Sequence, residues 1–197
     1  MQEVAGIDLG GTNIKIGRFD PDGNCIKHFS IPTPHPSTPE AVLEAIWRGL
    51  GQIVSSFDKL QAIGICTPGP ADATGRVARL AINLDGWKDI PVAGFLQDRT
   101  KLPVIVANDG NCAGLGEAWL GAGRGYKNMI MLTLGTGIGG AILLDGKLYT
   151  GSYGAGGELG LMNLSADGPE CNSGNRGSLE QHISALAVLR ETGERTG

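Results

Sequence analysis

The stretch Asp8-Leu9-Gly10-Gly11-Thr12-Asn13 lies between two short apolar runs near the start of the chain. The alternation of apolar residues on both sides predicts two strands joined by the glycines. A Gly-Gly-Thr turn exposes backbone N–H groups and a hydroxyl, which suits a phosphate. Asp8 at the strand end could hold an accompanying Mg²⁺, directly or through water. A plain two-glycine hairpin bend is the alternative at this point.

The residues after this turn exclude two common nucleotide motifs. A strand follows the glycines, whereas the dinucleotide fingerprint and the P-loop both require a helix there. The Gly-Lys-Ser/Thr that ends a P-loop is also missing from this stretch. If the turn binds a phosphate, it does so in another type of fold.

Composition describes a compact, acidic globule. The 197 residues are 41% hydrophobic and 18% charged, with 33 glycines, which allows one large domain or two small ones. A net charge of −4 argues against nucleic acid or an anionic membrane as the main partner. No apolar run is long enough to span a membrane, so we expect a cytoplasmic protein. Its cysteines (Cys25, Cys66, Cys112 and Cys171) are widely spaced, and we expect buried free thiols.

The order of predicted elements indicates a mixed α/β fold. Residues 4–31 have the pattern of three antiparallel strands, and 39–57 that of an amphipathic helix capped by Thr38. Short apolar strands at 60–66 and 104–107 then alternate with helices at 91–100 and 111–120.

A second cycle of similar architecture begins near Asn128. The strand Met129–Leu134, the turn Gly135-Thr136-Gly137 and the strand Gly139–Leu144 repeat the order of the opening motif. Two phosphate-type turns on two related halves suggest a nucleotide held between two lobes, with chance recurrence as the alternative. We place the first lobe at residues 1–120, with the first phosphate motif and the catalytic segment, and the start of the second lobe at 121–197.

Candidate catalytic and sugar-binding residues follow several of these elements. Asn108-Asp109-Gly110-Asn111 ends a strand, where Asp109 could accept a proton from a hydroxyl that attacks a phosphoryl group, or could simply cap the next helix. Asn83 could hydrogen-bond a sugar and Trp87 could pack on its ring, or both could belong to a structural turn. Glu158 lies among glycines that leave room for a ligand, and Glu180 is either a ligand contact or a first-turn helix acid.

Four segments in this order resemble motifs of the ROK family (repressors, open reading frames, kinases), with the glucokinase branch closest. They are Asp8-Leu9-Gly10-Gly11-Thr12-Asn13-Ile14-Lys15, Asn108-Asp109-Gly110-Asn111-Cys112-Ala113, Leu134-Gly135-Thr136-Gly137-Ile138-Gly139-Gly140 and Gly156-Gly157-Glu158-Leu159-Gly160. In that family they look like the first phosphate motif, the catalytic segment, the second phosphate motif and the sugar-contact loop. No helix-turn-helix precedes Asp8, so the resemblance is to the kinases and not to the repressors.

The resemblance implies an actin/hexokinase-like (ribonuclease H-like) two-lobe fold and ATP-dependent phosphorylation of a hexose, with glucose the leading substrate. It implies Asp109 as catalytic base, Asp8 near Mg²⁺ and a possible homodimer. The residues implied at ATP are Asp8, Gly10, Gly11, Thr12, Asn13, Lys15, Gly135, Thr136 and Gly137. Those implied at the sugar are Gly69, Asn83, Asn108, Asp109, Glu158 and Glu180.

The chain departs from the family at its zinc site and in its length. The family usually places a His where this chain has Leu161, and three cysteines in a pattern of which Cys171 alone remains. One thiolate cannot make a four-ligand site, so we expect no structural zinc. Because the same His touches the sugar, fructose or N-acetylmannosamine are alternative substrates. Family members are also longer, so we expect an incomplete second lobe, and a catalytically impaired sugar-binding remnant is the other reading.

Overall fold

The computed structural model describes residues 2–171 and 173–196. Its contacts divide the chain into two compact units. The first runs to Asp109 and includes Ser152–Ala155, and the second comprises Gly110–Gly151 and the residues from Gly156 onward. The first main change of unit along the chain therefore follows Asp109.

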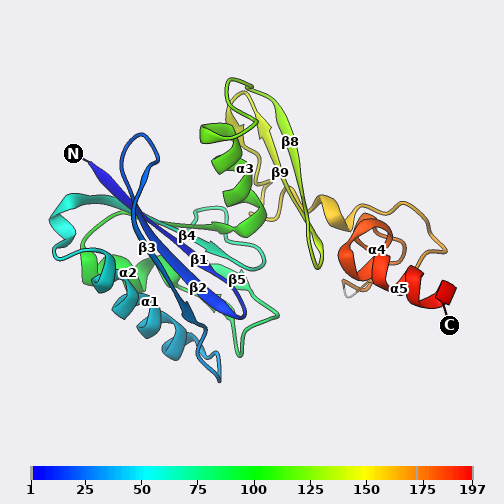
Figure 1. The fold of residues 1–197 in the computed structure, drawn as a ribbon, viewed down its shortest axis with the longest axis horizontal. Helices are drawn as coiled ribbons and strands as arrows, with labels where there is room; N and C mark the ends of the chain where they lie inside the picture. Colours follow the sequence, from blue (N-terminus) through cyan, green and yellow to red (C-terminus); the bar gives the residue numbers. More distant parts are fainter. Residues whose placement is uncertain (1, 172, 197) are drawn as a thin grey trace. The chain divides into compact units, whose positions relative to one another are not determined.

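The first unit is a five-stranded mixed sheet with two helices (Figure 1). Its elements are β1 (Glu3–Leu9), β2 (Asn13–Phe19), β3 (Cys25–Pro32), α1 (Pro39–Ile53), the short 3-10 helix η1 (Phe57–Lys59), β4 (Leu60–Thr67), β5 (Ala78–Leu80), β6 (Lys88–Ile90), α2 (Val92–Thr100) and β7 (Val104–Asn108). The strand order is β3-β2-β1-β4-β7, with β5 and β6 forming a separate pair. β1, β2 and β3 are antiparallel, and β1, β4 and β7 are parallel. The predicted order of strands and helices is confirmed.

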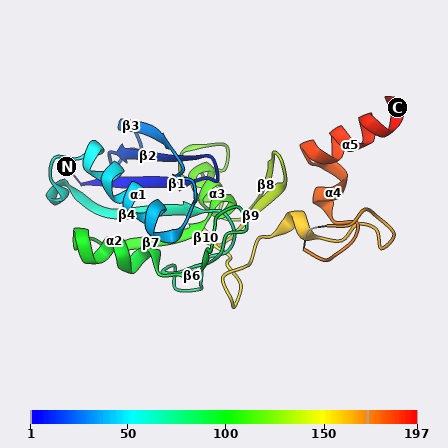
Figure 2. The same cartoon turned by 90° about the horizontal axis from the view of Figure 1, so that it is seen from below.

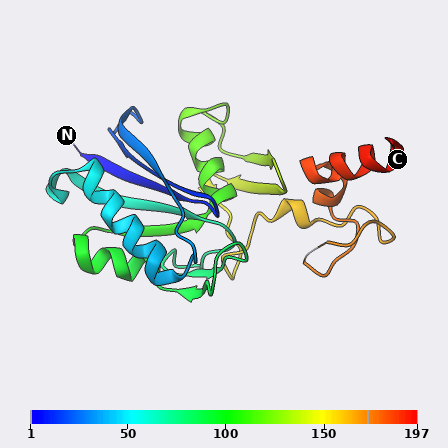
Figure 3. The same cartoon turned by 60° about the horizontal axis from the view of Figure 1, so that its bottom comes forward.

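Both helices of this unit cover the same face of the sheet (Figure 3). Alternate residues of the strands point toward them, as in Ala5, Ile7 and Leu9 of β1, each no more than 2% exposed. The apolar stripe of α1 fills the other side of this core, with Val42, Ile46 and Leu50 fully buried. The hydrophobic effect thus fixes which face of β1 is internal.

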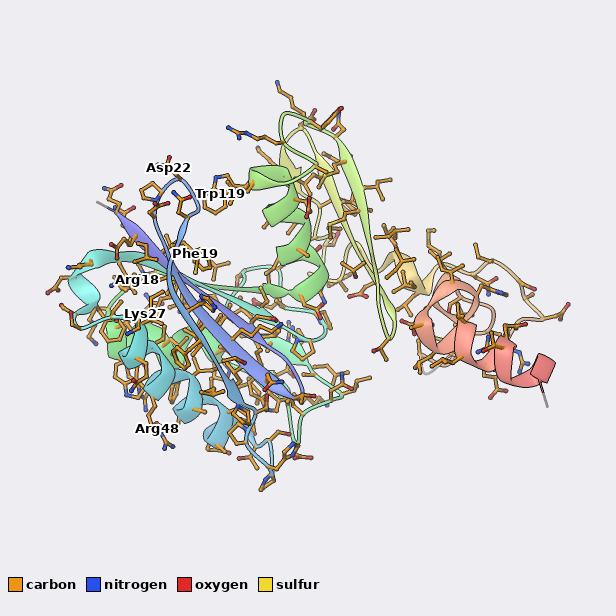
Figure 4. The ribbon with its side chains drawn as sticks, viewed as in Figure 1. Arg18, Phe19, Asp22, Lys27, Arg48 and Trp119 are labelled. Carbon is orange, nitrogen blue, oxygen red and sulfur yellow. The ribbon has the colours of Figure 1, made fainter. Side chains whose placement is uncertain are left out.

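The helix α1 begins as its sequence predicts but ends earlier. Thr38 caps it through a bond from the N–H of Ala41, with Pro39 in the first turn. It ends at Ile53, so the expected extent to residue 57 was wrong. The backbone becomes extended at Val54, and Lys27 of β3 donates to the carbonyl of Gln52 at 2.5 Å, which satisfies a group at this helix end (Figure 4).

The second unit is built on a three-stranded antiparallel sheet in the order β10-β9-β8 (Figure 2). Its elements are α3 (Asp109–Leu120), whose first residue belongs to the first unit, β8 (Met129–Leu134), β9 (Ile138–Leu144), β10 (Lys147–Leu148), the 3-10 helix η2 (Leu159–Leu161), α4 (Leu179–Ile183) and α5 (Ala185–Thr196). The repeated strand–turn–strand cycle is confirmed. α3 packs tightly on β9, because a Cβ at Gly114 would lie 2.3 Å from the Cβ of Ala141.

The thiols and the helix lengths test two further expectations. All four cysteines are free, as predicted, but Cys25 is exposed and two others are half-buried, so the expectation of burial holds for Cys171 alone. Within the described ranges, no helix combines the length and apolar character needed to cross a lipid bilayer.

Candidate active site

Predicted site residues of the first unit gather at one edge of the sheet, where its parallel strands end. Asp8 on β1 pairs with Cys66 on β4, and Cys66 pairs with Ala107 on β7. Asn108 is the next residue of β7, and Asp109 follows as the exposed first residue of α3. Because neighbouring strands are about 4.8 Å apart, Asp8 and the end of β7 are separated by about 10 Å along this edge. Polar groups at the carboxyl ends of parallel strands are typical of ligand sites in α/β proteins.

The first glycine turn is held closed by hydrogen bonds of its own and by one buried threonine. The N–H of Gly10 donates to the carbonyl of Asn13 at 3.0 Å. Thr33, which is 2% exposed, donates its hydroxyl to Gly10 O at 2.7 Å and its N–H to Thr12 O at 2.9 Å. The side chains of Thr12, Asn13 and Lys15 are exposed beside this braced turn. Sequence reasoning missed Thr33, because nothing local marks a hydroxyl that pairs across to a turn.

Asp8 forms an ion pair with Lys15 on the facing strand. Asp8 Oδ2 and Lys15 Nζ are 3.1 Å apart, and the two side chains are 47% and 68% exposed. Such an exposed pair contributes little to stability, so its charges remain accessible to a ligand. A carboxylate oxygen at a strand end is a donor that Mg²⁺ accepts, usually together with water and substrate phosphates. Asp8 therefore fits the role of one Mg²⁺ contact.

The loop that carries Asn83 is anchored by its neighbours, which leave Asn83 exposed. Leu84 is 6% exposed, and Asp85 Oδ2 accepts the N–H and the hydroxyl of Ser37 at 2.8 and 3.0 Å. These bonds hold the pKa of the Asp85 carboxyl below its usual value. A Cβ on Gly11 would lie 3.5 Å from the Cβ of Asn83, so the structure brings Asn83 beside the first glycine turn.

Trp87 has the structural role, which was one of the two alternatives that the sequence left open. The indole is 2% exposed and packs in the core of the first unit. Its Nε1–H donates to the carbonyl of Ser37 at 2.9 Å, which satisfies the polar end of a buried ring. Trp87 and Asp85 thus fix the Asn83 loop from two sides.

Gly69 and Asn108 are brought together in the first unit. The side-chain amide of Asn108 donates to the carbonyl of Gly69 at 3.3 Å. Thr67, the partner of Asn108 across the sheet, is fully buried, and its hydroxyl has no hydrogen-bond partner among the described residues. The bond between Asn108 and Gly69 links the loop after β4 to the residue that precedes Asp109.

The second glycine turn belongs to the second unit and is closed in a similar way. The N–H of Gly135 donates to Gly137 O at 3.0 Å, and the N–H of Ala185 donates to Gly135 O at 2.9 Å. Thr133 braces the turn as Thr33 braces the first one, since its hydroxyl accepts the N–H of Gly139 at 3.1 Å. Gly135 and Thr136 are exposed.

Glu180 reaches the start of β9 with its carboxylate, whereas the segment that carries Glu158 approaches the same strand through its backbone. Glu180 Oε2 accepts the main-chain N–H of Ile138 at 2.9 Å. The half-buried Glu158 directly precedes η2, and η2 lies so close to β9 that a Cβ at Gly160 would be 2.0 Å from Ile138 O.

The pattern that defines the ROK family matches residues 4–196. The chain belongs to the ROK family. It is 38% identical over 188 residues to a glucokinase of Thermotoga maritima, covering 95% of this chain and 59% of that protein. It is 37% identical over 191 residues to a glucokinase of Streptomyces coelicolor, covering 96% and 59%.

The fold is that of the ROK hexokinases and glucokinases. A crystal structure of a ROK family glucokinase from Streptomyces griseus, in complex with glucose and AMPPNP, superimposes with a TM-score of 0.83 at 36% identity. The match covers 98% of this chain and 61% of that one. The chain thus spans about three fifths of the length of these ROK relatives.

The residues at the zinc-binding positions of the ROK family do not provide a zinc site in this chain. Leu161 is 39% exposed and offers no ligand atom, and serines stand at 173 and 178 where cysteines were expected. Among the described residues, no three His, Cys, Asp or Glu side chains cluster as a metal site would need. A tetrahedral zinc needs four such donors.

Proposed function

We propose that this chain carries the catalytic and phosphate-binding residues of an ATP-dependent hexose kinase. The observation that carries the proposal is the placement of Asp109 at the carboxyl end of β7, in the same sheet edge as Asp8 and the first glycine turn. Membership of the ROK family supports it. The reaction transfers the γ-phosphoryl group of ATP to a sugar hydroxyl.

Asp109 is assigned as the general base. Its carboxylate accepts the proton of the sugar hydroxyl as that oxygen attacks the γ-phosphorus, and ADP leaves. Asp109 is exposed in the first turn of α3, where a substrate can reach it. The bond from the Asn108 side chain to Gly69 O orients Asn108, the residue before Asp109. Asn108 and Gly69 are therefore assigned to sugar positioning.

The two glycine turns are assigned to the phosphates of ATP. In the first, Gly10 closes the turn, while Gly11 and Thr12 supply main-chain N–H groups, Thr12 and Asn13 polar side chains and Lys15 a cation for anionic oxygens. In the second, Gly135 closes the turn, while Thr136 and Gly137 supply main-chain N–H groups and the Thr136 hydroxyl. Asp8 is assigned to Mg²⁺, which when bound neutralises charge that develops on the phosphate oxygens.

The sugar is assigned to Asn83, Asn108, Asp109, Glu158 and Glu180, with glucose as the first candidate. The relatives named glucokinase support this choice. Leu161 weakens selection at the expected histidine position, because it can neither donate nor accept a hydrogen bond. The loss of one such bond changes affinity by about 0.5–1.5 kcal/mol, so a second hexose such as N-acetylmannosamine or fructose is the alternative. A cytoplasmic location and a homodimer belong to the same proposal.

Sugar-dependent release of ADP tests the proposal. The chain is assayed against glucose, fructose, mannose and N-acetylmannosamine, with ATP and Mg²⁺, beside a version extended at its C-terminus. Release that needs a hexose supports the kinase and identifies the sugar. Sugar binding without ADP release in both versions would instead support a sugar-binding remnant.

A further inference from the structure

The segment from Met162 to Ser178 is closed by main-chain hydrogen bonds. The N–H of Leu179 donates to Met162 O, and that of Leu164 donates to Gly177 O, both at 2.8 Å. Within the loop, the N–H of Cys171 donates to Asn175 O at 2.8 Å. These contacts bring the two ends of the segment together.

Arg176 is the centre of the side-chain contacts that reinforce this closure. Its carbonyl accepts the amide of Asn163 at 2.6 Å, which joins the start of the segment to its end. Its guanidinium pairs with Glu170 at 2.7 Å, across the isolated bridge between the same two residues. The pair is exposed, so the Asn163 contact and the main-chain bonds carry most of the closure.

Cys171 and Ser178 are two buried residues of this segment. Cys171 is 7% exposed and Ser178 is fully buried. Burial raises the pKa of the Cys171 thiol, but hydrogen bonds from the side chain and N–H of Ser173 and an interaction with Ser178 outweigh it and lower the pKa. The buried Ser178 hydroxyl has no hydrogen-bond partner in the described part of the chain. Small polar groups therefore occupy the positions expected to bind zinc.

The closed segment leads directly into Glu180. Ser178 is the residue before α4, and Glu180 lies in the first turn of that helix. Glu180 Oε2 then accepts the N–H of Ile138 beside the second glycine turn.

We propose that residues 162–171 and 173–178 form a metal-free clasp, in which hydrogen bonds at Cys171, Asn163 and Arg176 replace a zinc ion and hold Glu180 on the N–H of Ile138. Glu180 is thereby a positioning residue for the second glycine turn as well as a sugar contact. The clasp itself does not depend on catalysis, and its relevance to sugar binding rests on the proposed function.

Hydrogen exchange at the Ile138 amide tests the clasp without an activity readout. We expect the amide to stay protected when the protein is dialysed against a strong chelator. Asn163→Ala should speed its exchange by about threefold to tenfold, as expected for the loss of one hydrogen bond. Glu180→Leu should speed it further, whereas Glu180→Gln keeps an acceptor oxygen and should keep most of the protection. Loss of protection on chelation, or no change in Asn163→Ala, would overturn the proposal.

Restoring the expected ligands provides a second, independent measurement. If the loop keeps its arrangement without metal, the triple variant Leu161→His/Ser173→Cys/Ser178→Cys should bind one zinc ion per chain through these residues and Cys171. The matched control adds Cys171→Ala and should lose that binding. The unaltered chain should bind no zinc in the same titration. Failure of the triple variant to bind zinc, or zinc binding by the unaltered chain, would contradict a metal-free clasp with this geometry.

Discussion

Glu180 accepts the main-chain N–H of Ile138 at 2.9 Å, so a carboxylate binds the residue that directly follows the second glycine turn. A Cβ added at Gly137 would lie 2.3 Å from the same carboxylate oxygen. The turn proposed to bind phosphate and a residue proposed to bind sugar therefore depend on each other sterically.

Substitution of the two glycines in this turn should have different effects. Gly137→Ala forces Glu180 to move, and we expect it to raise the KM for the hexose about tenfold or more, together with the KM for ATP. At Gly135 the nearest atom to an added Cβ is 4.0 Å away, so Gly135→Ala should leave the KM for the hexose nearly unchanged. Steady-state kinetics of both variants, with each substrate varied, makes the comparison. Equal KM values for the hexose in the two variants would contradict the steric dependence between Glu180 and this turn.

Asp8→Asn should affect Mg²⁺ use and not folding. Because the Asp8–Lys15 pair is about half exposed, its loss should change the free energy of unfolding by less than about 0.5 kcal/mol. The neutral amide is a poorer Mg²⁺ ligand, so the Mg²⁺ concentration for half-maximal rate should rise severalfold. Urea unfolding and a Mg²⁺ titration of the rate measure the two effects. A stability loss with an unchanged Mg²⁺ requirement would assign Asp8 to structure.

Asp72 should make stability fall at low pH. Its burial raises the pKa, but bonds from the hydroxyl of Thr74 and the N–H groups of Val77, Arg76 and Thr74 outweigh this and lower the pKa from 3.8 to about 2. Because the folded-state pKa is depressed, the contribution is complete above pH 4 and is lost as the pH falls toward 2. In urea unfolding, Asp72→Asn should be less stable than the wild type at pH 6, and the difference should shrink at pH 2.5. A difference that stays constant over this range would contradict the assignment.

Trp87→Phe should destabilise the first unit, since it removes the donor that satisfies the Ser37 carbonyl and leaves a gap in the core. We expect a loss of about 1–3 kcal/mol in the free energy of unfolding. Trp119→Phe is the matched control, because Trp119 is 49% exposed and its loss should stay within about 0.5 kcal/mol. Thermal unfolding of both variants measures this. Similar losses at the two positions would be inconsistent with a buried Trp87.

Local signals predicted most of the fold. Thr38 and Pro39 mark the start of α1 because capping is decided by adjacent residues, and the glycine turns mark both hairpins for the same reason. The end of α1 was mispredicted because the backbone leaves the helical conformation at Val54, whereas the apolar spacing does not stop there. Apolar spacing continues to Phe57, which stacks on Trp47 from outside the helix.

The position of the candidate residues in the sheet could be predicted from the sequence better than the contacts that support them. Asp8, Asn108 and Asp109 could be placed at strand ends because polar residues after apolar strands are visible in the sequence, and their proposed roles remain predictions. Thr33 and Thr133 were missed because a hydroxyl that braces a turn is recognisable after strand pairing brings it there. The role of Trp87 stayed open between two alternatives, because a tryptophan in a loop has the same local pattern whether it fills the core or contacts a ligand.

The most direct test compares sugar-dependent ADP release by the wild type and Asp109→Asn at saturating ATP and Mg²⁺. Removal of a general base typically costs about 10²- to 10⁴-fold in rate, so the variant should lose at least about a hundredfold in kcat while still binding the hexose. Such a loss supports Asp109 as the base of a hexose kinase. Equal rates in the two proteins would contradict it.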